Sequence, residues 1–584
     1  MKMVKSAYRA LNVLELLANR PAGLSFTEIL HETGLAKSTV HELMQTLVNR
    51  KYAHYRPLTK TYVAGARVLT LGVQYLRHSP DMRQAAELAR LMASCPGAKV
   101  RVGVLSGERV VIVQEERAEA GAEPYGPAVG AELPLTSALG KALLCLHSEE
   151  EIRLLWETGR GANVRSGQVQ SEWEGWRSFV WQLREVRSLG FAFEADHTGR
   201  GQYSISVPVW TDSGEVAVAV CLELAKAETD YADLKRIVYT LYDWCQRMNP
   251  AAKPGRAECG GEAAVAANPI YVSLPNLDSQ KALEYLHTFE QAFQAEKLPW
   301  LMTDGHDDEW KQRLCLELAM DKFSPRCIII SPVDAQESDR LFRAAAQAGI
   351  PAVCFQRPSR SRFADYYVGG DGYEQGVMQM EYVAARLKGR GHVLLLEGDP
   401  YNDNARNMSF GHQTVLAKYG ERLRATSVPV LRWSKEESRQ IVAELLASGE
   451  KLDAVVAGTD HMAEGVVEEL VRRKLAGKII VVGGDGDASA VRLIKARQQH
   501  ATVFQHPAEA ARTAARVASA LASGQADGGM ERKPLLRDVP GKEVYAAVIP
   551  YTFYDASNIA ELEAYWARSE SGLRTHKLGK GYVP

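Results

Sequence analysis

The chain has 584 residues, 46% of them hydrophobic and 24% charged, and a formal net charge of −1 at pH 7. These values are typical of a soluble globular protein, and the length suits about three domains of roughly 150 residues. No stretch is apolar enough to span a bilayer, which excludes the membrane as an expected partner.

The cysteines are scattered and form neither a CxxC pair nor a cluster with histidine. We therefore expect free thiols in a reducing compartment, with no metal site and no cofactor. The first apolar stretch, "ALNVLELLANR", is interrupted by Asn12 and Glu15, and no small-residue cleavage site follows it. No secretory signal is predicted, and the expected location is the cytoplasm. The cysteines are Cys95, Cys145, Cys221, Cys245, Cys259, Cys315, Cys327 and Cys354.

Residues 1–80 carry a strong excess of positive charge. They contain eleven Lys and Arg residues against four Glu residues, an excess of seven in a chain whose total formal charge is −1. Such a local excess is typical of a segment that binds a polyanion, so we expect a nucleic acid as its partner.

The same segment has the pattern of a winged helix-turn-helix. Apolar residues over 7–17 recur at helical spacing, and Ser25 with Glu28 forms a capping box that begins a second helix. Gly34 suits the tight turn before a third helix over 37–49. Two short strands, "YAHYR" and "KTYVAG", then predict a hairpin. The predicted buried side of the third helix consists of Val40, Leu43, Met44 and Leu47.

In this arrangement the third helix enters the major groove of DNA. Its amino-terminal end is suited to phosphate, its next turn to base edges, and the wing to the DNA backbone or the minor groove. A protein-binding helical module with a solvated polar face is the alternative. The candidate DNA-binding residues are Lys37, Ser38 and Thr39 for phosphate, His41 and Gln45 for bases, and Arg56 and Lys60 on the wing.

Three stretches resemble the IclR family of bacterial transcription regulators: "GLAKSTVHELMQTLVNRKY" followed by "YVAG", "LPLTSALGKALL" at 133–144, and the stretch at 190–220 that begins "GFAFEADHTGRGQYSIS". The resemblance extends to about residue 245. It implies a GAF-like α/β effector domain, in which helices flank an antiparallel sheet. Glu42, Lys51 and His197 stand where the family usually has arginine, glycine and an acidic residue. His197 favours a domain that serves only as a dimerising spacer.

From residue 270 onward, short apolar runs such as "IYVSL", "CIIIS", "HVLLLEG" and "DAVVAG" alternate with amphipathic helices. This βαβ repetition predicts doubly wound parallel sheets, and the length suits two lobes. The expected domains are a winged helix-turn-helix over 1–78, a GAF-like domain over 79–248, an Ala/Gly/Pro-rich linker over 249–268, a two-lobed domain over 269–556 and a polar tail over 557–584, whose packing stays open.

Ligands of such sheets bind beyond the carboxyl ends of the strands. Short forked polar groups follow these strands, and no nucleophile with a base is among them, which suits a neutral polyol rather than catalysis. The flat aromatic ring of Trp433 can stack against the CH face of a sugar ring. The residues after the strands are Gln356, Arg357, Asp371, Asp399, Asn402, Asn404, Thr459, Asp460, Asp485 and Gln505.

This half resembles the periplasmic sugar-binding proteins of the ribose and xylose type, through "IYVSLPNLDSQK", "IPAVCFQR", "YNDNAR", "LDAVVAGTDHMAEG", "VVGGDGD" and "ATVFQHP". The resemblance covers nearly all of 270–555. It implies a monosaccharide between the two lobes, and the "YNDNAR" stretch and the tail favour a pentose such as xylose. The ligand-binding residues that it implies are Lys281, Gln356, Arg357, Asn404, Arg406, Trp433, Thr459, Asp460, Asp485 and Gln505.

Structural alternatives stay open for several of these residues. Asp485 can cap a loop, Trp433 can pack in a core, Lys281 can be a solvated helix residue, and Arg406 can brace its own loop. The stretch "VVGGDGDASA" lacks the third glycine of a dinucleotide fingerprint, since position 489 is serine, and it lacks the spacing of a calcium loop.

The sequence therefore predicts a sugar-responsive transcription regulator that binds operator DNA as a homodimer or a dimer of dimers. The alternative is a regulator whose effector binds the GAF-like domain, with the second half as a protein-interaction module. A transport receptor would need export. An enzyme is not expected, because Glu397 and Asp399 have no partner histidine or metal set.

Overall fold

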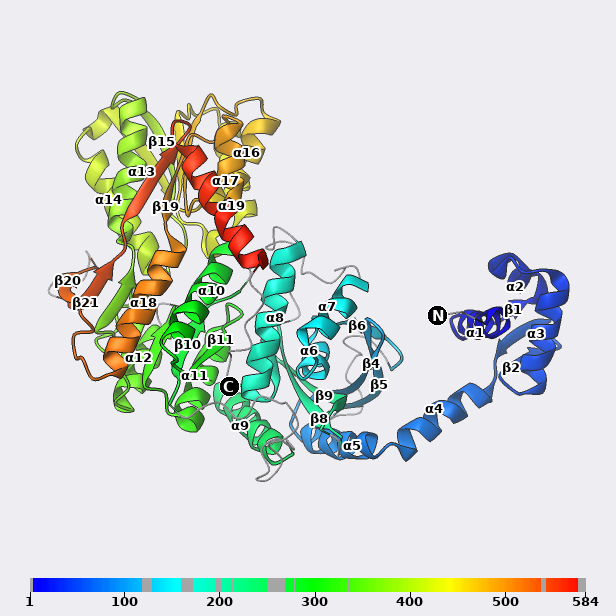
Figure 1. Ribbon diagram of the computed structural model, residues 1–584. Helices are drawn as coiled ribbons and strands as arrows, with labels where there is room; N and C mark the ends of the chain where they lie inside the picture. The colour runs from blue at the N-terminus through cyan, green and yellow to red at the C-terminus, as the bar shows by residue number, and fades with distance from the viewer. Residues whose placement is uncertain are drawn as a thin grey trace. The chain divides into compact units, whose positions relative to one another are not determined.

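The computed structural model describes residues 4–117, 129–158, 172–195, 201–211, 214–248, 268–277, 279–334, 337–536 and 542–575. His197 and linker residues 249–267 lie outside this part of the chain. The molecule divides into a compact unit over 1–92 and a larger one over 93–584 (Figure 1).

The first unit is a winged helix-turn-helix, as predicted. Ser25 and Glu28 form the capping box, and Gly34 ends the second helix in the left-handed conformation with φ 64°. The wing contains one strand more than the predicted hairpin, because β1 pairs with β3 and gives the order β1-β3-β2. The elements are α1 (Lys5–Ala18), β1 (Leu24–Ser25), α2 (Phe26–Thr33), α3 (Lys37–Asn49), β2 (Ala53–Arg56), β3 (Thr61–Ala64), α4 (Ala66–His78) and α5 (Pro80–Ala93).

Residues 93–248 form an antiparallel sheet with the order β6-β5-β4-β9-β8-β7, flanked by helices, as the GAF-like prediction required. Helix α6 packs on β8 and β9, and α8 packs on β7. The elements are β4 (Lys99–Ser106), β5 (Arg109–Arg117), β6 (Glu132–Pro134), α6 (Ala138–Leu144), α7 (Glu149–Thr158), α8 (Glu172–Leu189), β7 (Ala192–Ala195), β8 (Gln202–Trp210), β9 (Val216–Ala225) and α9 (Tyr231–Met248).

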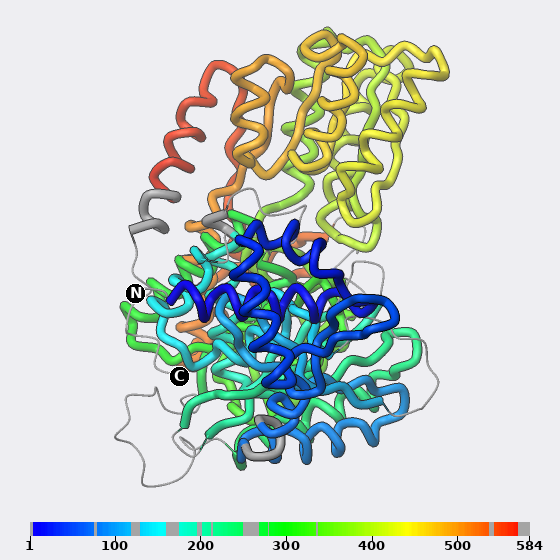
Figure 2. The backbone as a smooth tube through the Cα atoms, turned by 90° about the vertical axis from the view of Figure 1, so that its right-hand side faces the viewer, coloured from blue at the N-terminus to red at the C-terminus, as the bar shows by residue number. Residues whose placement is uncertain are grey.

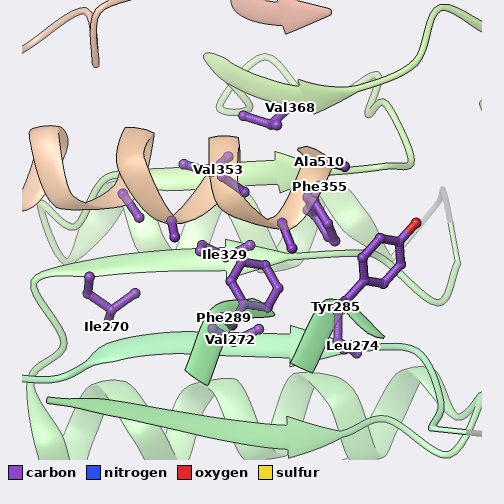
Figure 3. Packing of buried hydrophobic residues seen from close by; sticks show 14 of the residues in the cluster. Ile270, Val272, Leu274, Tyr285, Phe289, Ile329, Val353, Phe355, Val368 and Ala510 are labelled. Carbon is purple, nitrogen blue, oxygen red and sulfur yellow. The ribbon is translucent and has the colours of Figure 1, made fainter. Parts of the chain in front are cut away.

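The amino-terminal lobe of the second half has the sheet order β11-β10-β12-β13-β14-β21-β20, parallel except for β20 at its edge. Phe289 and Phe355 pack in its core under α18 (Figure 3). The elements are β10 (Ile270–Leu274), α10 (Gln280–Ala295), β11 (Trp300–Asp304), α11 (Glu309–Phe323), β12 (Cys327–Ile330), α12 (Ser338–Gln347), β13 (Ala352–Phe355), β14 (Tyr366–Gly369), α18 (Pro507–Ala522), β20 (Glu531–Pro534) and β21 (Glu543–Val548).

The carboxy-terminal lobe has the order β16-β15-β17-β18-β19-β22, parallel except for β22. Both lobes are thus doubly wound, as predicted, with antiparallel edges that the alternating pattern did not indicate. The elements are α13 (Gly372–Arg386), β15 (Gly391–Leu396), α14 (Asp403–Leu416), β16 (Leu423–Val428), α15 (Lys435–Ala447), β17 (Ala454–Ala457), α16 (Asp460–Arg472), β18 (Ile480–Gly484), α17 (Ala488–Lys495), β19 (Ala501–Gln505), β22 (Tyr551–Asp555) and α19 (Ile559–Thr575).

The tail, whose packing the sequence left open, contains the helix α19. It lies beside α17 (Figures 1 and 2). The indole nitrogen of Trp566 donates a hydrogen bond to the Gly486 carbonyl oxygen over 2.6 Å, and the Tyr565 hydroxyl donates one to Glu284 over 2.6 Å. The helix therefore contacts both lobes.

The chain crosses between the two lobes after Gly369, after Gln505 and after Val548, and these segments meet. A side chain on Gly370 would lie 2.3 Å from the Tyr551 hydroxyl and 2.6 Å from the Gln505 amide nitrogen. Gln505 also donates to the Ile549 carbonyl oxygen over 3.3 Å. The crossing segments thus form one packed hinge, and only glycine fits at position 370.

Candidate functional site

An ion pair joins the carboxyl-end edges of the two sheets. Lys281, near the start of α10 in the amino-terminal lobe, donates to Oδ1 of Asp485 over 2.9 Å. Asp485 directly follows β18 in the other lobe. Burial alone would lower the pKa of Lys281, but the charge and hydrogen bond of Asp485, together with Tyr285 and Tyr551, raise that pKa. The lysine is therefore charged and held between the lobes, and both side chains remain partly exposed, at 25% and 32%.

A second contact also joins the two lobes. The Asn404 amide nitrogen donates to the Gln356 carbonyl oxygen over 2.7 Å. Two side-chain polar atoms of these residues, Nε2 of Gln356 and Oδ1 of Asn404, are buried without a hydrogen-bond partner. A buried donor and acceptor left unpaired are costly, so this contact has the capacity to bind a polar group.

The backbone at the site adopts conformations that side chains disfavour. Gln356 has φ 63° and Asp485 has φ 88°, both in the left-handed region. Such strain in non-glycine residues is concentrated at functional sites, because the surrounding structure must compensate for it.

Arg357 follows β13 in the amino-terminal lobe, with its guanidinium turned to main-chain acceptors. Its Nη1 donates to the carbonyl oxygens of Pro332 and Val333 over 2.8 and 3.2 Å. Burial lowers the pKa of Arg357, and the nearby charges of Asp307 and Asp399 oppose that shift. The remaining guanidinium donors are suited to ligand hydroxyls.

Trp433 lies over two strand ends of the carboxy-terminal lobe. A side chain on Gly398, which follows β15, would be 2.2 Å from its ring, and one on Gly458, after β17, would be 2.7 Å away. The ring also packs on the hydrophobic core of the lobe. Trp433 therefore packs in the core, which was the structural alternative for this residue. It also lies at the carboxyl ends of β15 and β17.

Other sequence candidates have structural partners. The Thr459 hydroxyl caps α16 by accepting from the Met462 amide. Arg406 is half exposed and donates to the Pro400 carbonyl oxygen over 3.0 Å, which braces its own loop. Gln505 belongs to the hinge.

Asp460 is fully buried inside the carboxy-terminal lobe. Its carboxylate accepts from the Gln499 amide and the Thr502 hydroxyl, both over 2.7 Å, and from the Asp487 backbone amide over 3.0 Å. Burial, and then the charge of Asp487, raise the pKa of Asp460 well above its usual value. Its contacts hold the loop that follows β18, and therefore the backbone next to Asp485.

We expect the Asp460→Ala variant to destabilise this lobe by about 3 kcal/mol, because three donors, two of them buried, lose this acceptor. Hydrogen–deuterium exchange of residues 480–505 measures the local opening free energy. Glu468→Ala, an exposed position in the same lobe, is the matched control and should exchange like the wild type. Unchanged exchange in Asp460→Ala would contradict the role of this carboxylate.

Two tyrosines near the Lys281–Asp485 pair were not identified from the sequence. Tyr285 on α10 points its hydroxyl toward the carboxyl ends of the strands (Figure 3). Burial raises its pKa to about 12, and Lys281 and Asp485 are charged neighbours. Tyr551 has the same two neighbours. Neither tyrosine follows a strand of the recognised βαβ pattern, so no sequence signal distinguished them from core residues.

The candidate DNA-binding surface lies on α3 and the wing. Lys37, Ser38, His41 and Glu42 line a hollow together with Phe26 and Tyr62. Gln45 is exposed one turn after His41, and Arg56 and Lys60 are exposed on the wing, whereas Thr39 is half-buried. Lys51 has φ 63°, which explains why glycine suits this position.

Across the described ranges, no group of three or more His, Cys, Asp or Glu side chains has the geometry of a metal site. No helix in that part of the chain is long and apolar enough to cross a membrane. The described cysteines are free, and all except the half-buried Cys95 are buried.

Comparisons with known proteins divide the chain in the same way. Residues 6–57 match the IclR helix-turn-helix domain, residues 74–249 the bacterial transcriptional regulator IclR C-terminal domain, and residues 280–526 a periplasmic binding protein domain.

Curated relatives cover the two halves separately. The HTH-type transcriptional regulator XynR of Escherichia coli (strain K12) is 28% identical over 240 residues, which span 40% of this chain and 91% of that protein. The D-xylose-binding periplasmic protein of the same organism is 29% identical over 222 residues, 37% of this chain and 66% of that protein. The ribose import binding protein RbsB of Bacillus subtilis (strain 168) is 24% identical over 265 residues, which span 45% of this chain and 81% of that protein. The chain therefore joins the two domains of an IclR-type DNA-binding regulator to a periplasmic-binding-protein domain of the sugar-binding kind.

Proposed function

We propose that this chain is a cytoplasmic transcription regulator that binds operator DNA through α3 and its wing, and a monosaccharide between the two lobes of its second half. The best candidate for the sugar is a pentose such as D-xylose, on the strength of the xylose-binding relative. No cofactor and no catalytic step enter this function.

The proposal rests on two buried polar atoms of Gln356 and Asn404 that have no hydrogen-bond partner. Nε2 of Gln356 is a donor and Oδ1 of Asn404 an acceptor, and they come from opposite lobes. A sugar hydroxyl can both donate and accept hydrogen bonds, so the hydroxyls of a sugar can satisfy these two atoms. A ligand that does so favours the closed arrangement of the lobes.

The Lys281–Asp485 pair extends the same site with a charged donor and a charged acceptor. Hydrogen bonds to charged groups contribute more than neutral ones, which suits a neutral ligand that presents only hydroxyls. Trp433 adds an aromatic surface against which the apolar face of a sugar ring packs.

In the proposed mechanism, sugar binding shifts the equilibrium between open and closed lobes, and this changes the spacing or orientation of paired DNA-binding heads. The shift requires a difference in affinity between the two states, about 1.4 kcal/mol for each tenfold change in population. We propose a homodimer, or a dimer of dimers, that reads a two-fold related operator.

Calorimetric titration of the full chain with D-xylose, D-ribose, L-arabinose, D-glucose and D-galactose tests the proposal. We expect saturable heat with D-xylose, and a change in operator affinity at the same sugar concentration. Heat with another of these sugars would correct the identity of the ligand but keep the site. The absence of heat with all five sugars would contradict a free monosaccharide as the effector.

A further inference from the structure

Helix α8 of the IclR C-terminal domain packs directly against the amino-terminal lobe of the sugar-binding half (Figure 1). Its Trp181 is only 3% exposed and belongs to the same hydrophobic cluster as the core of that lobe. The ring centroids of Trp181 and Trp300 are 5.7 Å apart. One continuous core therefore crosses the boundary between the two domains.

A buried charge from the lobe enters the IclR C-terminal domain at this boundary. Lys311 on α11 has no exposed surface, and its Nζ lies 3.4 Å from Oε1 of Glu185 on α8. The same ammonium group is 5.8 Å from the centre of the Phe193 ring on β7. The other oxygen of Glu185 accepts a hydrogen bond from the Asp304 backbone amide over 3.3 Å.

In a second buried ion pair, the IclR C-terminal domain provides the cation and the lobe provides the anion. Arg184, on α8, donates to Glu290 of α10 over 3.0 Å, and its guanidinium lies 4.5 Å from the centre of the Trp181 ring. The Glu290 side chain is fully buried and that of Arg184 is nearly so. The IclR C-terminal domain and the amino-terminal lobe thus each contribute one buried cation and one buried anion. These two pairs fix the orientation of the domain relative to the lobe.

The edge of the contact is polar. Lys235 pairs with Glu317, Lys322 pairs with Asp243, and the Tyr239 hydroxyl donates to Asp321. Partly exposed pairs of this kind contribute less than buried ones, whereas a buried charge that loses its partner costs several kcal/mol. The inner pairs are therefore the contacts on which the association depends.

We propose that the IclR C-terminal domain holds the amino-terminal lobe of its own chain as a permanently bound partner, with the Lys311 ammonium group as a tethered cationic ligand on Glu185. The domain and the lobe then behave as one block, and only the carboxy-terminal lobe moves. This consequence rests on the proposed function. The bound lobe, and not a free small molecule, is then the partner of this domain.

A cleavage experiment tests the contact without any sugar. A protease recognition site is inserted into residues 250–266 of the full chain, and the folded, purified protein is cut. We expect the two fragments to stay together on gel filtration. In the Lys311→Met variant, which leaves Glu185 buried and unpaired, we expect their affinity to fall by about 100-fold or more. Lys418→Met, an exposed lysine on the carboxy-terminal lobe, is the matched control and should not change it.

The double variant Glu185→Gln/Lys311→Met separates a direct pair from a general loss of folding. It removes both charges at nearly constant volume, so we expect it to recover at least about tenfold of the lost affinity. Fragments that separate in the wild type would overturn the proposal. So would a double variant no better than Lys311→Met, or a Lys311→Met chain that holds together like the control. None of these results depends on whether a sugar binds, so they are distinct from a failure of the proposed function.

Discussion

The Asp485→Ala variant is expected to lose sugar binding, with an affinity at least about 100-fold lower than that of the wild type, or about 3 kcal/mol. The change removes a carboxylate that accepts ligand hydroxyls and leaves Lys281 without its partner at 2.9 Å. Calorimetric titration of the full chain with the sugar that binds the wild type measures the loss.

Two further variants define the cause of this loss. Asp485→Asn keeps the shape and tolerates the left-handed backbone at φ 88°, so it isolates the charge, and we expect an intermediate affinity. Asp527→Ala removes an exposed carboxylate beyond the end of α18 that is remote from the hinge, and should bind like the wild type. Wild-type affinity in both Asp485 variants would mean that the ligand does not contact this carboxylate.

Replacements on α3 are expected to separate affinity for DNA from specificity. Gln45→Ala should weaken binding to the selected operator by about 10- to 100-fold and leave binding to random DNA unchanged, because it removes a base contact. Lys37→Ala, at the start of the helix, should weaken binding to both and reduce the slope of log affinity against log salt by about 0.9, the value for one phosphate contact. An operator is first selected from random DNA with the wild-type chain, and fluorescence anisotropy at several salt concentrations gives the affinities.

Asn49→Ala, at the exposed carboxyl end of α3, is the matched control and should leave both affinities unchanged. Equal losses on operator and random DNA in Gln45→Ala would show that Gln45 contacts the backbone rather than a base. An unchanged salt slope in Lys37→Ala would remove this lysine from the phosphate contacts.

The sequence was sufficient to predict those elements whose structure depends on neighbouring residues in the chain. The capping box at Ser25 and the helix over 37–49 depend on neighbouring residues, and both are in place. The central parallel strands are buried on both faces, so they appear as continuous apolar runs. The edge strands β16 and β20 and the helix α15 were missed, because their partly exposed residues mix polar and apolar types without a clear period.

At the site, the sequence identified the strand ends but not the direction of each side chain. Asp460 and Asp485 both come shortly after parallel strands. Asp485 pairs with Lys281 of the other lobe, whereas Asp460 turns inward to Gln499 and Thr502. That difference depends on packing between segments about 40 residues apart in the chain, which a local pattern does not contain.

The sequence by itself determined the kinds of domain, their order and the chemistry at the strand ends, because these follow from periodicity and from residue type. Only the tertiary structure decided how the domains meet. Lysine and glutamate on helices are usually exposed to solvent, yet Lys311 and Glu185 lie buried against one another. Whether a charge is exposed depends on the surface that folding brings against it, and that surface comes from a distant part of the chain.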